Sequence, residues 1–144
     1  MNFLANQLLA RVEPSAPAGQ TTLISDVVDM LGFDGVTFVA MLGDVTSGST
    51  LTLQAQQGDE ADGSDATDVP TAAASFVADI SDADNGLLAV EVFRPTKRYL
   101  RTTLSRESQN AVVDGILAVR SQSNEAPVLQ APSVIATSFA LSPD

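Results

Sequence analysis

The repeated spacing of short apolar, β-branched segments constrains this chain more than any other feature. From Thr21 onward, about seven or eight such segments follow one another roughly every ten to fifteen residues, separated by Gly, Asp, Asn and Ser. Within residues 50–56, Leu51, Leu53 and Ala55 alternate with polar residues, which is typical of a half-buried strand. The sequence therefore predicts an all-β fold, an antiparallel β-sandwich, while periodicity alone leaves a jelly-roll and an immunoglobulin-like strand order both open.

The expected strands can be placed by residue number. They cover residues 21–30, 36–42, 50–56, 72–80, 87–94, 98–104 and 110–120, with a long surface loop over residues 58–70. Residues 36–42 are mainly apolar on both faces, which indicates a central strand. In the last strand, Val113, Gly115, Leu117 and Val119 are expected to share one face.

The length of 144 residues predicts a single domain, and its composition divides it into three parts. Residues 1–20 are expected to form an N-terminal arm and linker, because residues 2–12 have roughly helical apolar spacing and are followed by two prolines and a glycine. Residues 21–121 form the predicted sandwich. Residues 122–144, which contain three prolines, are expected to form an extended C-terminal tail.

Composition argues against several classes of function. Because the chain contains neither Cys nor His, it lacks the thiol nucleophile, the usual proton shuttle and the commonest zinc ligands. We therefore expect no enzymatic activity and no cofactor. The net charge of −11 argues against nucleic acid as a partner. Prolines interrupt the longest uncharged stretch, residues 126–143, and no basic N-terminal leader is evident, so neither a membrane span nor a signal peptide is expected.

The acidic segment 59–68 is the most site-like stretch for a metal ion. Asp59, Asp62 and Asp65 are weak candidate ligands, since calcium prefers hard oxygen atoms. The EF-hand spacing fails, however, because placing Gly63 at the sixth position puts Gly58 first and Val69 twelfth. A solvated loop is the favoured interpretation, and a calcium-dependent binding module is kept as an alternative.

Basic and apolar side chains in three segments are candidates for contact with another protein. Arginine binds carboxylates with two hydrogen bonds and, like tyrosine, is enriched at interfaces; the alternative is that the basic run neutralises the protein's own acids. The apolar residues near the termini could order on a partner. The candidate interface residues are Phe3, Leu4, Leu8, Leu9, Arg94, Lys97, Arg98, Tyr99, Arg101, Val134, Ile135 and Phe139.

Four short motifs resemble a family of small structural proteins of tailed bacteriophages that are encoded near the major capsid protein. They are GFDGVTFV at residues 32–39, TDV at the end of the acidic loop (67–69), VFRPTKRYLR at 92–101 and NEAPV at 124–128. The resemblance spans about residues 21–128; residues 72–81 depart from it in being richer in Ala.

The resemblance implies a capsid decoration or cementing protein with a jelly-roll fold and no catalytic residues. Its partner would be the major capsid protein on the outside of an icosahedral head. It would be made in the bacterial cytoplasm and located on the virion. Self-association is also expected, a homodimer being favoured over a trimer. A head–tail connector or tail component is the alternative structural role, for which rings of six or twelve copies would be the sign.

Overall fold

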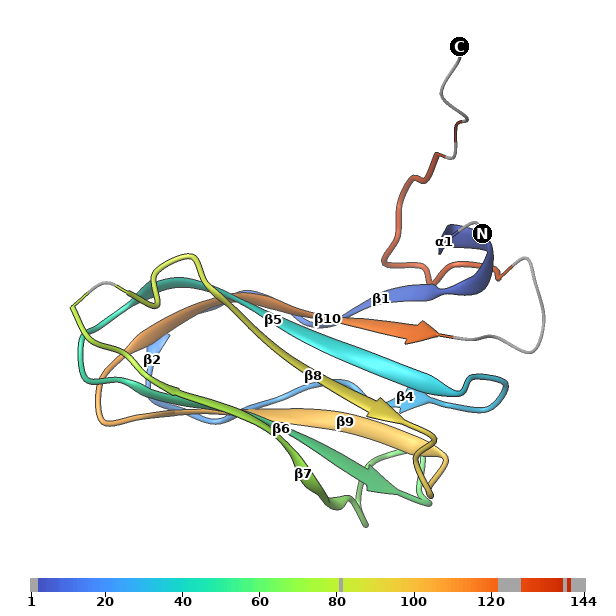
Figure 1. Cartoon of the computed structure of the whole chain (residues 1–144), viewed down its shortest axis with the longest axis horizontal. Coiled ribbons are helices and arrows are strands. Elements are labelled where there is room, and N and C mark those ends of the chain that lie inside the picture. The colour runs from blue at the N-terminus through green and yellow to red at the C-terminus, as the bar shows by residue number, and fades with distance from the viewer. Residues whose placement is uncertain (1–2, 81, 122–127, 139, 141–144) are drawn as a thin grey trace.

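Two antiparallel β-sheets packed face to face make up the body of the molecule (Figure 1). The computed structural model describes residues 3–80, 82–121, 128–138 and 140. The sandwich expected from the sequence is confirmed.

Sheet A contains the first and last strands side by side. Its order is β1 (Leu8–Glu13), β10 (Ala111–Ser121), β5 (Gly35–Val45) and β8 (Leu87–Phe93), with β2 (Ala16–Gly19) pairing the other half of β10. In sheet B the two short strands β3 (Leu23–Ile24) and β4 (Val28–Asp29) share the edge of β9 (Tyr99–Glu107), followed by β6 (Thr50–Gly58) and β7 (Thr67–Val77). One short helix, α1 (Phe3–Asn6), precedes β1.

The strand order is that of a jelly-roll. The chain passes from sheet A to sheet B after β2, returns for β5, makes the β6–β7 hairpin in sheet B, and then alternates through β8, β9 and β10. If β1/β2 and β3/β4 each count as one strand position, eight positions fill two four-stranded layers, as in jelly-rolls.

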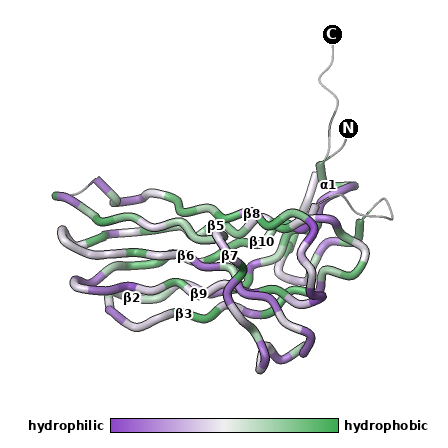
Figure 2. Tube along the Cα trace, turned by 60° about the horizontal axis from the view of Figure 1, so that its bottom comes forward, coloured by the Kyte–Doolittle hydropathy of each residue, from purple (hydrophilic) through white to green (hydrophobic). Residues whose placement is uncertain are grey.

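Alternating side chains of both sheets fill the space between them. Leu51, Leu53 and Ala55 of β6 are fully buried, as their spacing predicted, and face Val36 and Phe38 of the central strand β5 across the core cluster. Figure 2 shows apolar residues mainly along the strands and hydrophilic ones mainly in the connecting loops. Burial of this aliphatic surface is what holds the sheets together.

The N-terminal segment differs from the expected arm. Residues 8–19 lie within sheet A as β1 and β2, and only α1 matches the helical spacing seen in residues 2–12. The burial pattern of β1 is that of a strand: Ala10 and Val12 point inward onto the core, while Arg11 between them is exposed. A short segment whose apolar residues fit both helical and strand spacing becomes a strand here, because a strand can pair with β10.

A bulge changes the predicted face of β10. Its register with β5 shifts between Val113 and Gly115, so Ile116 and Ala118 are fully buried while Leu117 and Val119 lie on the outer face. The expected common face of Val113, Gly115, Leu117 and Val119 is therefore wrong beyond the bulge.

Candidate protein-binding end of the sandwich

Two segments that are far apart in sequence meet at one end of the sandwich, which we call the motif end: residues 30–34, before β5, and residues 94–98, between β8 and β9. The backbone N–H of Arg94 donates to the carbonyl of Asp34 at 2.6 Å, and that of Met30 donates to the carbonyl of Arg98 at 2.8 Å. Residues 32–34 belong to the first of the motifs that carry the resemblance, and residues 94–98 belong to the third. The jelly-roll order brings them together because β5 and β8 are paired in sheet A and β4 and β9 in sheet B.

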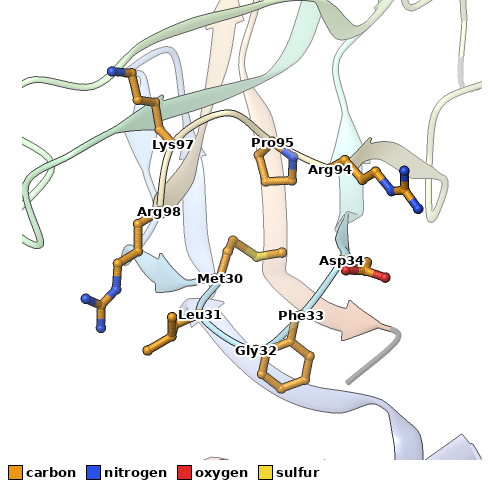
Figure 3. A pocket seen from close by; sticks show the side chains of 9 residues that line it. All are labelled: Met30, Leu31, Gly32, Phe33, Asp34, Arg94, Pro95, Lys97 and Arg98. Atoms are coloured by element: carbon orange, nitrogen blue, oxygen red, sulfur yellow. The ribbon is translucent and has the colours of Figure 1, made fainter. Parts of the chain in front are cut away.

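The two segments enclose an open hollow of about 500 Å³ (Figure 3). Its lining includes one acidic side chain, Asp34, beside a larger apolar and basic part. The apolar part is contributed by Met30, Leu31, Phe33 and Pro95, and the basic part by Arg94, Lys97 and Arg98. Leu31 is 68% exposed. A mixed apolar and basic concavity of this kind suits a protruding protein segment that carries both an apolar and an acidic side chain.

Two of the three lining cations are neutralised within the molecule. Arg98 donates two hydrogen bonds to the carboxylate of Asp29, at 2.9 and 2.8 Å, and Lys97 Nζ lies 3.0 Å from the carboxylate of Asp59. The hydrogen bond from Arg98 lowers the pKa of Asp29, and the same bond raises the pKa of Arg98. The alternative interpretation of the basic run, that it neutralises the protein's own acids, thus holds for Lys97 and Arg98.

Arg94 differs from its two neighbours. Within the described part of the chain its guanidinium forms no ion pair, and it lies over the ring of the half-exposed Phe93 at 5.1 Å. Its backbone has a φ of 53°, a conformation that is unfavourable for residues other than Gly and Asn. The loop therefore presents one exposed cation that no acidic side chain of the described residues neutralises.

Tyr99 and Arg101 do not line the hollow. Tyr99 begins β9 opposite Asp29 and Gly58, and Arg101 donates to the side-chain oxygen of Gln56 at 2.9 Å. Both are partly buried on the outer face of sheet B.

Arg120 is a residue of this end that the sequence analysis did not single out. It donates to the carbonyl of Asp29 at 2.8 Å and lies over the ring of Phe33 at 5.4 Å, and burial lowers its pKa. It therefore contacts Phe33, which lines the hollow, and Asp29, which pairs with the lining residue Arg98. Its position on a strand, rather than in the basic run, gave no signal of this role.

The terminal candidates also lie at the motif end (Figure 1). Phe3 is half exposed, while Leu4, Leu8 and Leu9 are partly buried, and Leu8 packs on the core as part of β1. In the C-terminal segment, Val134 is partly buried and Ile135 is 96% exposed; Phe139 lies outside the described residues.

The acidic loop is organised by its own hydrogen bonds. The carboxylate of Asp65 accepts from the backbone N–H groups of Asp59 and Glu60, and that of Asp62 accepts from the N–H of Ser64; these bonds lower the pKa of both aspartates. Among the described residues, no three acidic side chains converge in a way that could hold a metal ion.

Comparisons with known proteins add little. No protein-family model and no curated protein sequence matches the chain. Among solved structures it is similar to a family two carbohydrate esterase from Cellvibrio japonicus, at 12% identity and a TM-score of 0.37. The match covers 85% of this chain but only 36% of the esterase chain. A likeness this weak carries no argument about function. In the part of the chain that the structure describes, no helix is both long and apolar enough to span a bilayer.

Proposed function

We propose that this protein is a structural virion protein that binds the outside of an icosahedral phage head and decorates or cements the lattice of the major capsid protein. The observation that carries the proposal is the meeting of residues 30–34 and 94–98 at the motif end. Two motifs of the phage family, about sixty residues apart, there form one surface with the composition of a protein-binding site.

Within that surface, Arg94 is the anchor of the proposed contact. A carboxylate of the capsid protein would pair with its guanidinium, while the exposed Leu31 and the half-exposed Phe93 would cover apolar capsid side chains. Lys97 and Arg98, already paired with acids, would shape the hollow rather than anchor the partner.

The charge of the whole chain is compatible with this role. At −11, free copies repel one another and stay soluble. On a repeating shell, many weak contacts strengthen one another through effective concentration, above all if copies associate as the two-fold dimers that we favour over trimers.

The test is binding to purified heads that lack this protein. Arg94→Gln and Gln109→Glu each lower the net charge by one, but Gln109 lies in the β9–β10 turn at the opposite end of the sandwich (Figure 1). We expect saturable binding of the wild type, about tenfold weaker binding of Arg94→Gln, and no change for Gln109→Glu, measured by co-sedimentation.

Each failure has its own meaning. Absence of wild-type binding would overturn the proposed function, and rings of six or twelve copies would favour the connector role instead. Equal binding of the two variants would show that heads are bound through another surface.

A further inference from the structure

The outer edge of β1 is covered by side chains rather than by a strand. Leu9 and Arg11 both direct their backbone N–H groups away from β10, on the side where the described chain provides no further strand. The N–H of Leu9 donates to the side-chain oxygen of Gln130 at 2.7 Å, and the N–H of Arg11 to the hydroxyl of Ser133 at 3.0 Å. Two side chains thus occupy the positions of two carbonyl groups of an absent neighbouring strand.

The covering segment, residues 128–134, is called the strap. It has no regular secondary structure and is held mainly by Gln130, whose amide group also donates to the carbonyls of Leu4 and Gln7 at 2.9 and 2.6 Å. One further backbone bond joins Val128 to Ala5 at 2.7 Å. The strap is attached through a few partly solvated hydrogen bonds and through Ala131, a small side chain that packs on the core. Because this attachment is limited, a strand offering carbonyl groups can compete with it.

We propose that the β1 edge accepts the β1 strand of a second copy, and that the strap regulates this pairing by covering the edge. Two antiparallel β1 strands related by a two-fold axis at Ala10 would place Leu9 of each copy opposite Arg11 of the other. Leu9 and Arg11 would then exchange both of their backbone hydrogen bonds with the partner copy. The two A sheets would become continuous.

The side chains of β1 fit this register. With the axis at Ala10, the small Ala10 side chains meet at the axis, Leu8 lies opposite Val12 on the inner face, and Glu13 lies opposite the uncharged Gln7. In this register no like charges lie directly opposite each other, so the strand pair itself adds no local repulsion. The general repulsion between two acidic copies remains and opposes the dimer. Added salt would weaken that repulsion and strengthen the dimer.

The experiment measures self-association of the full-length chain by sedimentation velocity over a range of concentrations. In Gln130→Ala/Ser133→Ala, which removes both covering side chains, we expect self-association about tenfold tighter than in the wild type. Gln109→Ala/Ser138→Ala, the same chemical change at two exposed positions outside the strap, is the control and should match the wild type.

Proline at position 11 identifies the surface used. Because the Arg11 N–H faces away from β10, Arg11→Pro removes an outward donor and leaves the β1–β10 ladder intact. Added to the double variant it should abolish the tightened self-association, whereas Arg11→Ala in the same background should retain it; circular dichroism confirms that each variant is folded.

The proposal is overturned if the double variant associates no more tightly than the wild type, or if its dimer survives Arg11→Pro. A double variant that stays monomeric but gains affinity for heads would show that the edge serves a capsid strand, and would also exclude the second copy. Since the self-association measurement contains no heads, its outcome does not depend on the proposed function.

Discussion

Asp29 and Arg98 form the best-defined ion pair at the motif end, and it links β4 to the segment that leads into β9. Two hydrogen bonds of 2.8 and 2.9 Å join the side chains, and these are the main reason that the pKa of Asp29 is lowered. Because both side chains are partly exposed to solvent, the pair contributes only modestly to the free energy of unfolding.

The pair makes stability depend on pH in a defined direction. Since the folded-state pKa of Asp29 is lower than its ordinary value, the contribution is fully present above about pH 4 and is lost as pH falls through the folded-state pKa. We expect Asp29→Asn to lower the free energy of unfolding by up to about 1 kcal/mol at pH 7 and by progressively less below pH 4. Urea unfolding of the variant and the wild type between about pH 7 and pH 3 measures this difference in the free energy of unfolding. A difference that stays the same in acid would contradict the assigned role of the Asp29 carboxylate. Asp44→Asn, at an exposed position near the end of β5, is the control.

Arg106 shows what side-chain alternation could predict and what it could not. Alternation along the predicted strand 98–104 places Leu100, Thr102 and Leu104 on one face. One further step of two residues reaches Arg106, which is 3% exposed. Its guanidinium donates to the carbonyls of Pro17, Thr21 and Ala111. The period indicates the direction of the side chain, but only the fold supplies the carbonyl groups that make its burial acceptable.

At the scale of elements, the bulge in β10 decides which side chains reach the core. Gly115 has a φ of 145°, and a Cβ atom there would lie 2.9 Å from a guanidinium nitrogen of Arg11 and 3.1 Å from the carbonyl oxygen of Glu13. A residue with a side chain would therefore be both strained in its backbone and crowded against β1.

Gly115→Ala should lower the free energy of unfolding by about 1–3 kcal/mol, because the bulge must either distort or move away from β1. Gly19→Ala is the matched control, since its Cβ would have an ordinary contact of 3.4 Å with Arg106 and its φ is not in the left-handed region. Chemical denaturation of both variants provides the comparison. Equal losses would mean that the bulge has no special need for glycine.

The element boundaries show the same limit of sequence patterns. The strand over residues 50–56 was predicted well because one of its faces is apolar and the other is polar. The strand over residues 87–94 was recognisable as a short apolar run bounded by turn residues, although its outward face is also mainly apolar. Residues 8–13 were assigned to an arm because six residues can satisfy helical and strand spacing together, and only pairing with β10 separates the two. The loop expected over residues 58–70 ends earlier, at Thr67, where pairing with Gln57 begins β7.

At the scale of the whole molecule, the candidate contacts are concentrated at one end. The hollow and the described parts of both terminal segments lie there, while the β5–β6, β7–β8 and β9–β10 turns lie at the other end (Figure 1). The far end has its own exposed apolar residues, among them Ile80 at 78% and Leu87 at 66% exposure.

Under the proposed function, this polarity predicts that the motif end faces the capsid. Because the chain contains no cysteine, single thiols can be introduced by Leu31→Cys at the motif end and by Ile80→Cys in the β7–β8 loop, both at exposed apolar positions. A polyethylene glycol chain attached at position 31 should abolish most binding to heads, because the bulky polymer would keep the motif end away from the capsid surface. The same chain at position 80 should leave binding intact. Co-sedimentation measures both conjugates, and loss of binding only at position 80 would reverse the assigned orientation.

The sequence contained the parts of the motif end but not their arrangement. The basic run within residues 94–101 and the GFDG segment at residues 32–35 could each be identified in the sequence. Their proximity in space depends on a strand order that periodicity does not encode. That Lys97 and Arg98 are paired while Arg94 is presented outward depends on the positions of Asp59 and Asp29 in space.

The place of β10 between β1 and β5 has a consequence for biosynthesis. Sheet A cannot assemble on the ribosome until residues 111–121 have emerged, because both β1 and β5 pair with this late strand. β1 and β2 therefore have no partner strand until β10 has been synthesised, whereas β5 can already pair with β8. Topologies dominated by such distant pairings fold slowly. We therefore expect β10 to complete sheet A late in folding, and the net charge of −11 to oppose association of incomplete copies before then.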